Sequence, residues 1–216
     1  IFNGEIYNFK LLKKKYFSNK RFKSKGDGEV LLHLYEKFGI NFIKKIKGMF
    51  AICIVDENKN KIFLIRDRFG IKPLYYHYDS LHKKIYFCSE IKGIKELRNI
   101  NTGINNAEAY KFFQQGLINS NRETWFKNIF QVSPSHYIEY SQDKIIEKKY
   151  YSIEDFIDEK QDEEKISFKK YLNNFKEKLQ TSFQEHNQFD VKAGIHLSGG
   201  VDSAVLAAMS NYNKKK

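Results

Sequence analysis

The feature that most constrains this 216-residue chain is a glycine-rich turn near its C-terminal end, Ser198-Gly199-Gly200-Val201-Asp202-Ser203. Ile195-His196-Leu197 before it predicts a short buried strand, and the residues after it predict a helix. Glycine allows backbone conformations closed to other residues and lets a ligand approach closely. A turn between a strand and a helix also directs free N–H groups and the positive end of the helix dipole at one spot, which suits a phosphate group.

Asp202 would repel a phosphate unless a cation lay between them, so the loop implies Mg²⁺. It is not a Walker A loop, because no Gly-Lys-Ser/Thr follows the glycines. A tight turn capped by Ser198 or Asp202 is the alternative reading, and an isolated Ser-Gly-Gly would favour it. The complete run from Leu197 to Ser203, however, resembles the pyrophosphate loop of the N-type ATP pyrophosphatases, which adenylate a substrate and release pyrophosphate.

The formal net charge of +12 invites a nucleic-acid hypothesis. The positive charge is mostly Lys, spread over turns and helix faces. Arg, the residue that usually recognises phosphates and bases, is scarce. We therefore expect no nucleic-acid partner. No apolar run is long enough to span a membrane, no signal peptide is present, and the two cysteines do not make a disulfide framework. These features favour a cytoplasmic protein without a membrane anchor.

Hydrophobic periodicity predicts the elements that precede the loop. The expected helices are 9–16, 28–38, 41–47, 107–115 and 167–186, and the expected strands are 1–8, 49–55, 61–66, 74–78 and 84–88, with a hairpin over 137–149. Asp27 is placed to cap the helix 28–38, which Gly39 ends. Short strands at hairpin spacing indicate antiparallel sheets. Residues 155–165 are charged and without pattern, so we expect a linker there and two domains, 1–160 and 161–216.

Several short motifs precede the loop, and each taken alone could be structural. In chain order they are Asn3-Gly4-Glu5-Ile6-Tyr7-Asn8, Gly48-Met49-Phe50-Ala51, Arg66-Asp67-Arg68-Phe69-Gly70-Ile71-Lys72-Pro73-Leu74-Tyr75-Tyr76 and Ser89-Glu90-Ile91-Lys92. Together with the glycine-rich loop, this series resembles the glutamine-hydrolysing asparagine synthetases over nearly the whole chain. Because the sequence starts without Met and ends soon after a helix begins, we expect a fragment of such a protein.

The resemblance implies an α+β domain followed by an α/β domain. The first would be an N-terminal-nucleophile hydrolase, a sandwich of antiparallel sheets with helices, and the second would begin a parallel sheet at the pyrophosphate loop. The activity implied is asparagine synthesis from aspartate, ATP and glutamine, through β-aspartyl-AMP, with ammonia supplied by glutamine hydrolysis. Glutamine, aspartate and ATP would be the substrates and Mg²⁺ the metal, and a homodimer is left open.

The same motifs assign site residues. The side-chain amide of Asn3 and the backbone N–H of Gly4 match the family's oxyanion hole. Glu5 and Asp27 match the acidic residues that hold the α-ammonium group of glutamine, with a plain helix cap as the alternative for Asp27. Asp202 would hold Mg²⁺. The residues that match the ATP site are Leu197, Ser198, Gly199, Gly200, Asp202 and Ser203.

The sequence also departs from the family pattern. The family's nucleophile is a cysteine at the mature N-terminus, whereas position 1 is Ile, and Cys53 and Cys88 lie inside expected strands. The family's arginine that binds the glutamine carboxylate is absent, and so is most of the synthetase domain. Gly28 stands where the family often has Thr or Cys, and Ser135 stands where it usually has Gly. Two alternatives therefore stay open: an amidotransferase for another carboxylate, such as a sugar acid or a peptide, and a non-catalytic scaffold whose basic surface binds acidic partners.

Overall fold

The computed structural model describes residues 1–97, 100–118, 121–157, 167–187 and 194–214. The chain forms two compact units, Ile1–Ile157 and Asp158–Lys216, and each is described below by itself. Most of the expected linker, residues 158–165, lies outside the described residues. Among the helices that are described, none combines the length and the apolar character that a membrane crossing requires.

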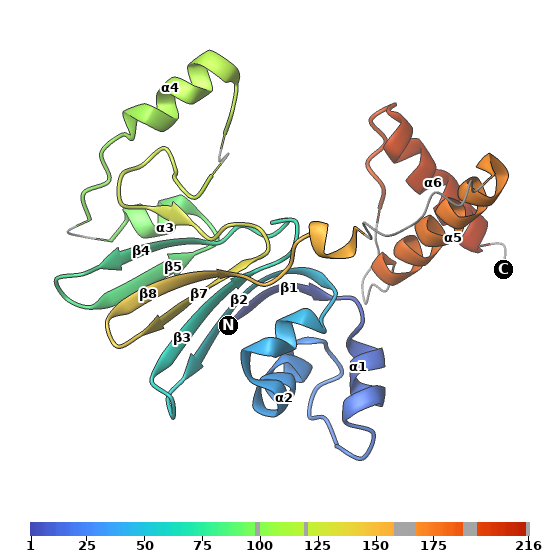
Figure 1. The fold of residues 1–216 in the computed structure, drawn as a ribbon, viewed down its shortest axis with the longest axis horizontal. Coiled ribbons are helices and arrows are strands. Elements are labelled where there is room, and N and C mark those ends of the chain that lie inside the picture. Colours follow the sequence, from blue (N-terminus) through green and yellow to red (C-terminus); the bar gives the residue numbers. More distant parts are fainter. Residues whose placement is uncertain (98–99, 119–120, 158–166, 188–193, 215–216) are drawn as a thin grey trace. The chain divides into compact units, whose positions relative to one another are not determined.

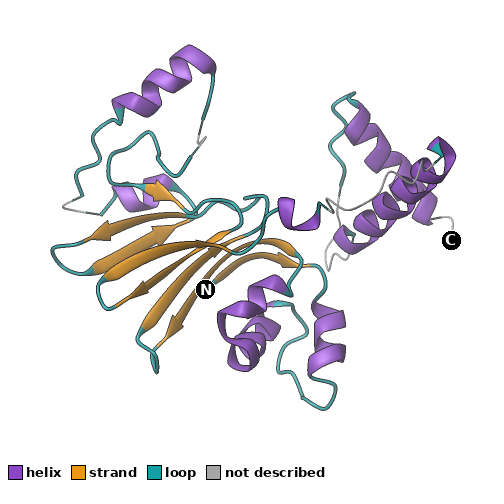
Figure 2. Cartoon of the chain, viewed as in Figure 1, coloured by secondary structure: helices purple, strands orange, loops and turns teal. Residues whose placement is uncertain are grey.

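A five-stranded antiparallel sheet forms the centre of the first unit (Figures 1 and 2). Its spatial order is β1-β2-β3-β7-β8, with β1 at one edge. The strands are β1 (Phe2–Ile6), β2 (Gly48–Asp56), β3 (Lys61–Arg66), β7 (His136–Ser141) and β8 (Lys144–Lys149). The antiparallel sheets confirm the α+β class expected for this part of the chain.

The central strand β2 is apolar on both faces because the sheet separates two hydrophobic cores. Phe50, Ile52 and Ile54 belong to one core, whereas Ala51 and Cys53, which alternate with them, belong to the other. This is the pattern expected for a strand covered on both sides. Alternation along β2 therefore fixes which side chains can reach each layer of the fold.

Helices cover one face of the sheet (Figure 1). They are α1 (Phe9–Tyr16), α2 (Gly28–Phe38) and the 3₁₀ helix η1 (Gly39–Lys44). Helix α2 has the bounds predicted from its apolar stripe and buries Val30, Leu31 and Leu34. The helix expected over 41–47 was wrong in type and position, because η1 starts directly after α2 at Gly39, whose φ of 57° lets the chain turn.

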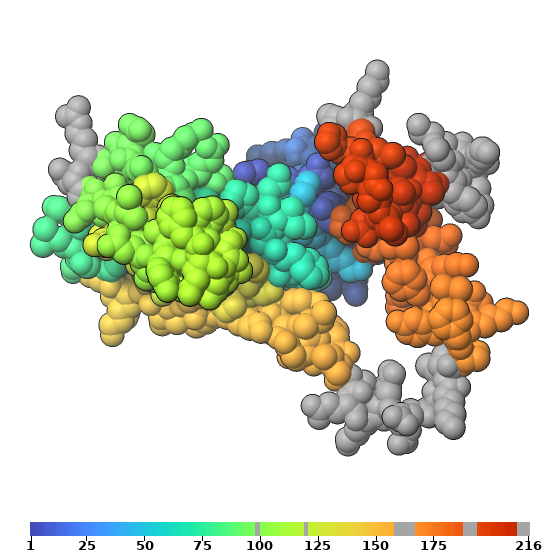
Figure 3. All heavy atoms as spheres, turned by 90° about the horizontal axis from the view of Figure 1, so that it is seen from above, coloured from blue at the N-terminus to red at the C-terminus, as the bar shows by residue number. Residues whose placement is uncertain are grey.

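A second, three-stranded antiparallel sheet covers the other face, in the order β5-β4-β6. It consists of β4 (Tyr75–Asp79), β5 (Lys84–Cys88) and β6 (Phe130–Gln131). Tyr76, which is fully buried, and Leu74 pack in one cluster with Cys53 and Leu64 of the first sheet. Two sheets thus share a core, as the predicted sandwich requires. Helix α3 (Ile91–Lys95) follows β5, η2 (Glu154–Phe156) ends the unit, and α4 (Asn106–Gln115) lies on its surface (Figure 3).

The second unit contains two described helices, α5 (Phe168–His186) and α6 (Val201–Lys214). Ser167 caps α5, since its hydroxyl accepts a hydrogen bond from the Lys170 N–H. The buried strand expected at 195–197 was wrong: the segment forms no strand, and Leu197 is 63% exposed. A strand needs neighbouring strands for its backbone groups, and the described part of this unit holds only helices. The parallel sheet therefore stays a prediction.

Candidate functional site

Within the described residues, the edge strand β1 carries a backbone donor, the N–H of Gly4, for which no acceptor is found. Ile1 and Cys53 exchange two N–H to carbonyl bonds of 2.9 Å, and the Tyr7 N–H donates to the Lys47 carbonyl at 2.8 Å. Bonded positions alternate along an antiparallel pair, so Ile1, Asn3, Glu5 and Tyr7 face β2 with their backbone groups. The N–H of Gly4 therefore points away from β2 at the edge of the sheet. An oxyanion hole requires such a donor, one that the sheet does not occupy.

Only glycine fits at position 4. Its φ of +150° is a conformation that L side chains rarely adopt, and an added Cβ would lie 2.1 Å from the Met49 carbonyl oxygen and 2.7 Å from the Phe50 Cα. The same tight approach recurs across the pair at Gly48, where a Cβ would lie 2.1 Å from the Glu5 carbonyl oxygen. The two glycines let β1 and β2 approach closely where the unused N–H is presented.

Asn3 lies beside a cavity of about 310 Å³ between the two sheets. Its Nδ2 donates a 3.2 Å hydrogen bond to the Ser89 hydroxyl, which follows β5. The cavity is lined by Ile1, Asn3, Ala51, Ile52, Cys53, Leu74, Phe87, Cys88 and Ser89. Asn3 and Gly4 can thus direct one side-chain and one backbone N–H toward the same end of β1.

Asp27 occupies the N-cap position of α2, but its carboxylate makes no capping bond to that helix. The simple cap reading is therefore wrong. Oδ2 instead accepts a 2.7 Å hydrogen bond from the Ile6 N–H, which points outward like that of Gly4. Two residues of strand span about 7 Å. Along the edge of β1, the Gly4 N–H consequently lies about 7 Å from the Ile6 N–H that binds the Asp27 carboxylate.

Glu5 lies between these positions on the strand, half-buried, on the same face as Asn3. Burial raises the pKa of the neighbouring Tyr7 hydroxyl, and the carboxylates of Glu5 and Asp67 raise it further. Tyr7 thus stays protonated at neutral pH and adds no negative charge. The anionic groups at this edge are Glu5 and Asp27, which suit a cationic ligand group.

Both cysteines line the cavity beside Asn3, and both belong to strands, Cys53 to β2 and Cys88 to the end of β5. Both thiols are free. Burial raises the pKa of the Cys53 thiol, so it is held in the unreactive protonated form. Cys88 packs against α3, where an added Cβ at Gly93 would lie 2.6 Å from its Sγ. That these strand residues do not replace an N-terminal cysteine stays a prediction.

In the second unit, the glycine-rich loop brings its six predicted residues together at the start of α6. Gly199 has φ of +83°, and nothing lies within 4 Å of a Cβ built on it. The hydroxyls of Ser198 and Ser203 lie 3.1 Å apart, and Ser203 Oγ also donates to the Gly200 carbonyl at 3.0 Å. Leu197 and Asp202 are exposed, Asp202 in the first turn of α6. The loop is therefore open, with small hydroxyl groups on its inner side.

The described residues hold no group of three or more His, Cys, Asp and Glu side chains that could bind a metal ion. Asp202 would hold Mg²⁺ only together with phosphate and water oxygens, which is the usual mode for this ion.

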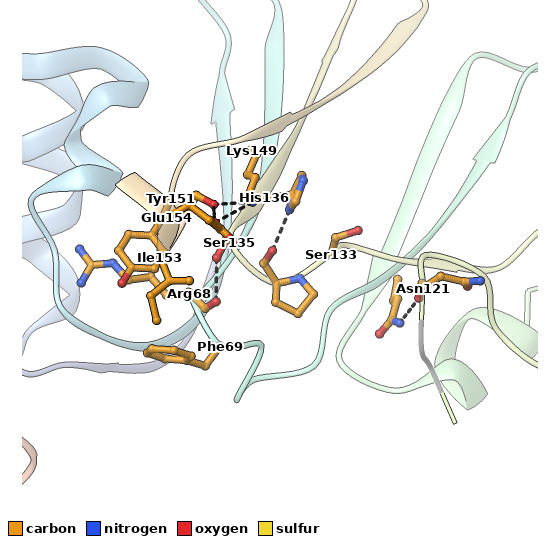
Figure 4. A pocket seen from close by; sticks show the side chains of 13 residues that line it. Arg68, Phe69, Asn121, Ser133, Ser135, His136, Lys149, Tyr151, Ile153 and Glu154 are labelled. Carbon is orange, nitrogen blue, oxygen red and sulfur yellow. Dashed lines mark hydrogen bonds and ion pairs between the residues drawn. The ribbon is translucent and has the colours of Figure 1, made fainter. Parts of the chain in front are cut away.

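A separate cavity of about 490 Å³ lies between the loop that follows β3 and the segments on either side of the β7–β8 hairpin (Figure 4). Arg68, His136 and Tyr151 are among its lining residues, and no predicted site residue is. Ser135, one of the departures from the family pattern, has φ of +65°, and its hydroxyl donates to the Arg68 carbonyl at 2.7 Å. The left-handed backbone explains why glycine suits this position, and the hydrogen bond offsets part of the strain of a serine there.

Ser89 belongs to one of the motifs noted in the sequence, but the sequence predicted no role for it. The signal that could have drawn attention to it is its place directly after a strand, before the charged pair Glu90 and Lys92. Its contact with Asn3 joins positions 86 residues apart and follows only from the packing of the two sheets.

Comparison with known proteins finds matches to both parts of the chain. A family model described as a glutamine amidotransferase domain matches residues 1–151, and one described as asparagine synthase matches residues 174–215. The chain is 39% identical over 211 residues to asparagine synthetase [glutamine-hydrolyzing] 2 of Bacillus subtilis, covering 95% of the chain and 28% of that protein. A putative asparagine synthetase [glutamine-hydrolyzing] 2 of Methanocaldococcus jannaschii is 36% identical, with 97% and 39% covered.

A third relative carries a different name. Amidase chry2 of Gibberella zeae is 27% identical over 217 residues, covering 98% of this chain and 30% of the relative. The chain thus spans well under half the length of the curated relatives that it matches.

Proposed function

The chain belongs to the glutamine amidotransferase domain family, and from this we propose that its first unit hydrolyses glutamine within an ATP-dependent asparagine synthetase. The observation that carries the proposal is the edge of β1, where the Gly4 N–H points outward two residues before the Ile6 N–H that donates to the Asp27 carboxylate. In the whole protein, hydrolysis gives glutamate and ammonia, and the ammonia attacks β-aspartyl-AMP to give asparagine and AMP. The substrates are glutamine, aspartate and ATP.

At the glutaminase site, each residue has a distinct task. Asp27 and Glu5 bind the α-ammonium group of glutamine by charge. The side-chain carbonyl then lies near Asn3 and Gly4, whose N–H groups stabilise the oxygen as it gains negative charge in the tetrahedral intermediate. The resemblance assigns the attack on this carbonyl to a cysteine at the mature N-terminus. A donor of this kind typically contributes a factor of about 10² to 10³ in turnover.

The loop of the second unit fits a nucleotide phosphate in its size and its donors. Gly199 leaves space around its α-carbon, and the hydrogen bonds of the Ser198 and Ser203 hydroxyls to groups of the loop itself can be exchanged for bonds to a ligand. We propose that these residues, with Gly200 and Leu197, bind ATP. Mg²⁺ held at Asp202 would neutralise phosphate charge during adenylation of the substrate carboxylate.

In one alternative, the amidated carboxylate is not that of aspartate. The choice can be made with the full-length protein, ATP and ammonia, by measuring pyrophosphate release with aspartate, sugar acids and short peptides in turn. We expect release with aspartate together with asparagine formation. Release with another acid and none with aspartate would establish the alternative. A homodimer and a cytoplasmic location stay predictions.

Glutamine hydrolysis is tested separately, by following glutamate formation in the same protein. Steady glutamate release that is lost in Asn3→Ala, while ammonia-dependent synthesis persists, is the expected result. A protein that releases no glutamate but still binds acidic partners would instead be the non-catalytic scaffold.

A further inference from the structure

Ser89 is held in a fixed position by the turn between β5 and α3. β5 ends at Cys88, and α3 begins at Ile91. Ile94 of α3 is 1% exposed and anchors the helix in the unit. Gly93 permits the close approach, because a Cβ there would lie 2.6 Å from the Cys88 Sγ. The tight β5–α3 turn therefore leaves Ser89 little freedom at the wall of the cavity beside Asn3.

The Ser89 hydroxyl is not needed to cap α3. Glu90 is the N-cap residue of that helix, and no side-chain capping bond is made there. The hydroxyl instead accepts the 3.2 Å hydrogen bond from Asn3 Nδ2. In the described part of the chain, this is the one side-chain hydrogen bond of Asn3, which is otherwise exposed. The contact links the edge strand of one sheet to the other sheet.

We propose that Ser89 is a positioning residue that holds the Asn3 carboxamide in the orientation needed for the oxyanion hole. The inference rests on the proposed glutaminase function. An amide NH₂ group carries two hydrogens. One is directed at Ser89, which fixes the plane of the amide and aims the other at the place where the oxyanion develops. Without the hydroxyl, an exposed Asn3 would sample several rotamers, of which only one donates correctly.

The role predicts a specific kinetic change in the full-length protein. Ser89→Ala should lower kcat for glutamine hydrolysis about ten- to a hundredfold. A misplaced Asn3 amide loses a hydrogen bond that forms only in the transition state. KM for glutamine should change less than about threefold, since Asp27 and Glu5, not Asn3, hold the α-ammonium group. Ser89→Thr keeps the hydroxyl and should recover most of the turnover. Ammonia-dependent synthesis should be unchanged in both variants.

A double-mutant cycle separates positioning from a general structural effect. If Ser89 acts through Asn3, then Ser89→Ala should add no more than about a twofold loss to Asn3→Ala. A structural role would lower activity by the same factor in both backgrounds. Ser141→Ala is the matched control, because Ser141 is also half-buried at a strand end and its hydroxyl makes no hydrogen bond in the described part of the chain. Its turnover should equal that of the wild type.

The outcomes are distinguishable from failure of the proposed function. A wild-type protein without glutaminase activity would remove the function and this inference together. An active wild type with Ser89→Ala at full turnover would overturn the inference alone, as would additive losses in the cycle. If Ser89→Ala does not fold, Ser89→Thr decides: a hundredfold loss in a protein that folds and retains ammonia-dependent synthesis would contradict a role carried by the hydroxyl.

Discussion

Asp27 accepts a 2.7 Å hydrogen bond from the backbone N–H of Ile6, although it stands at the N-cap of α2. The carboxylate therefore joins the start of that helix to the edge of the sheet. This geometry separates its structural task from its proposed binding task, because an amide oxygen can accept the same bond without carrying charge.

Asp27→Asn should accordingly raise KM for glutamine at least about tenfold while leaving the unfolding temperature nearly unchanged. The amide keeps the bond to Ile6 but loses the charge that attracts the α-ammonium group. Steady-state glutaminase kinetics and thermal unfolding on the same sample make the comparison. Asp27→Ala is the control, since it removes the structural bond as well and should lower stability by about 1–3 kcal/mol. An unchanged KM in Asp27→Asn would rule out the binding role.

Gly4→Ala should destabilise the first unit by about 2–4 kcal/mol and abolish glutamine hydrolysis. The methyl group would meet the Met49 carbonyl oxygen at 2.1 Å, so β1 must move away from β2. Gly39→Ala is the matched control. It also has a positive φ, 57°, but its Cβ meets nothing within 4 Å, so only the conformational cost of about 1–2 kcal/mol applies. Denaturant unfolding measures both. Equal losses in the two variants would show that the contact with Met49 does not matter.

Stability should fall with acid partly through Glu29. The backbone N–H groups of Lys23 and Ser24 donate to its carboxylate and lower its pKa from 4.5 to about 2. Because the folded pKa is depressed, the stabilisation is complete above pH 4.5 and is lost as pH falls from there toward 2. Glu29→Gln should make unfolding midpoints less dependent on pH across this window. The comparison is a set of thermal unfolding curves from pH 6 to pH 2.5, and parallel curves for the two proteins would contradict it.

Asp202→Asn should abolish synthesis with either glutamine or ammonia while glutamine hydrolysis survives. The substitution keeps size and hydrogen bonding but removes the charge that would hold Mg²⁺ against the phosphates, and the loss should reach several orders of magnitude. Pyrophosphate release with ammonia as nitrogen donor is the measurement. If Asp202 is only part of a helix cap, Asn replaces it well, and activity stays within about tenfold of the wild type, roughly 1.4 kcal/mol in barrier.

Local patterns were sufficient for most of the first unit. Helix α1, helix α2, strand β3 and strand β5 have the predicted bounds, because each depends on the spacing of apolar residues and on the turn residues beside it. The order of the strands in two sheets came from the family resemblance rather than from periodicity. Alternation alone does not specify which strands become neighbours.

The contacts that organise the candidate site could not be predicted from local sequence patterns. The bonds of Asp27 to Ile6 and of Asn3 to Ser89 join residues 21 and 86 positions apart, so no window of sequence contains both partners in a recognisable arrangement. The prediction of a strand at 195–197 was wrong because it considered only the local sequence. Ile195 and Leu197 suit a strand, but a strand also depends on partners elsewhere in a sheet, and the described part of the second unit supplies none.

The alternation of β2 between two cores has a consequence for how this protein can change over generations. Phe50 faces the helices and Ala51 faces the second sheet, and β1 follows the same alternation through its pairing with them. Replacing a side chain in β1 alters one contact. Inserting or deleting a single residue there would reverse every position beyond it, turning Asn3 toward the helices and taking the outward N–H from Gly4. The site therefore depends on the number of residues in β1 as strictly as on the identities of Asn3 and Gly4.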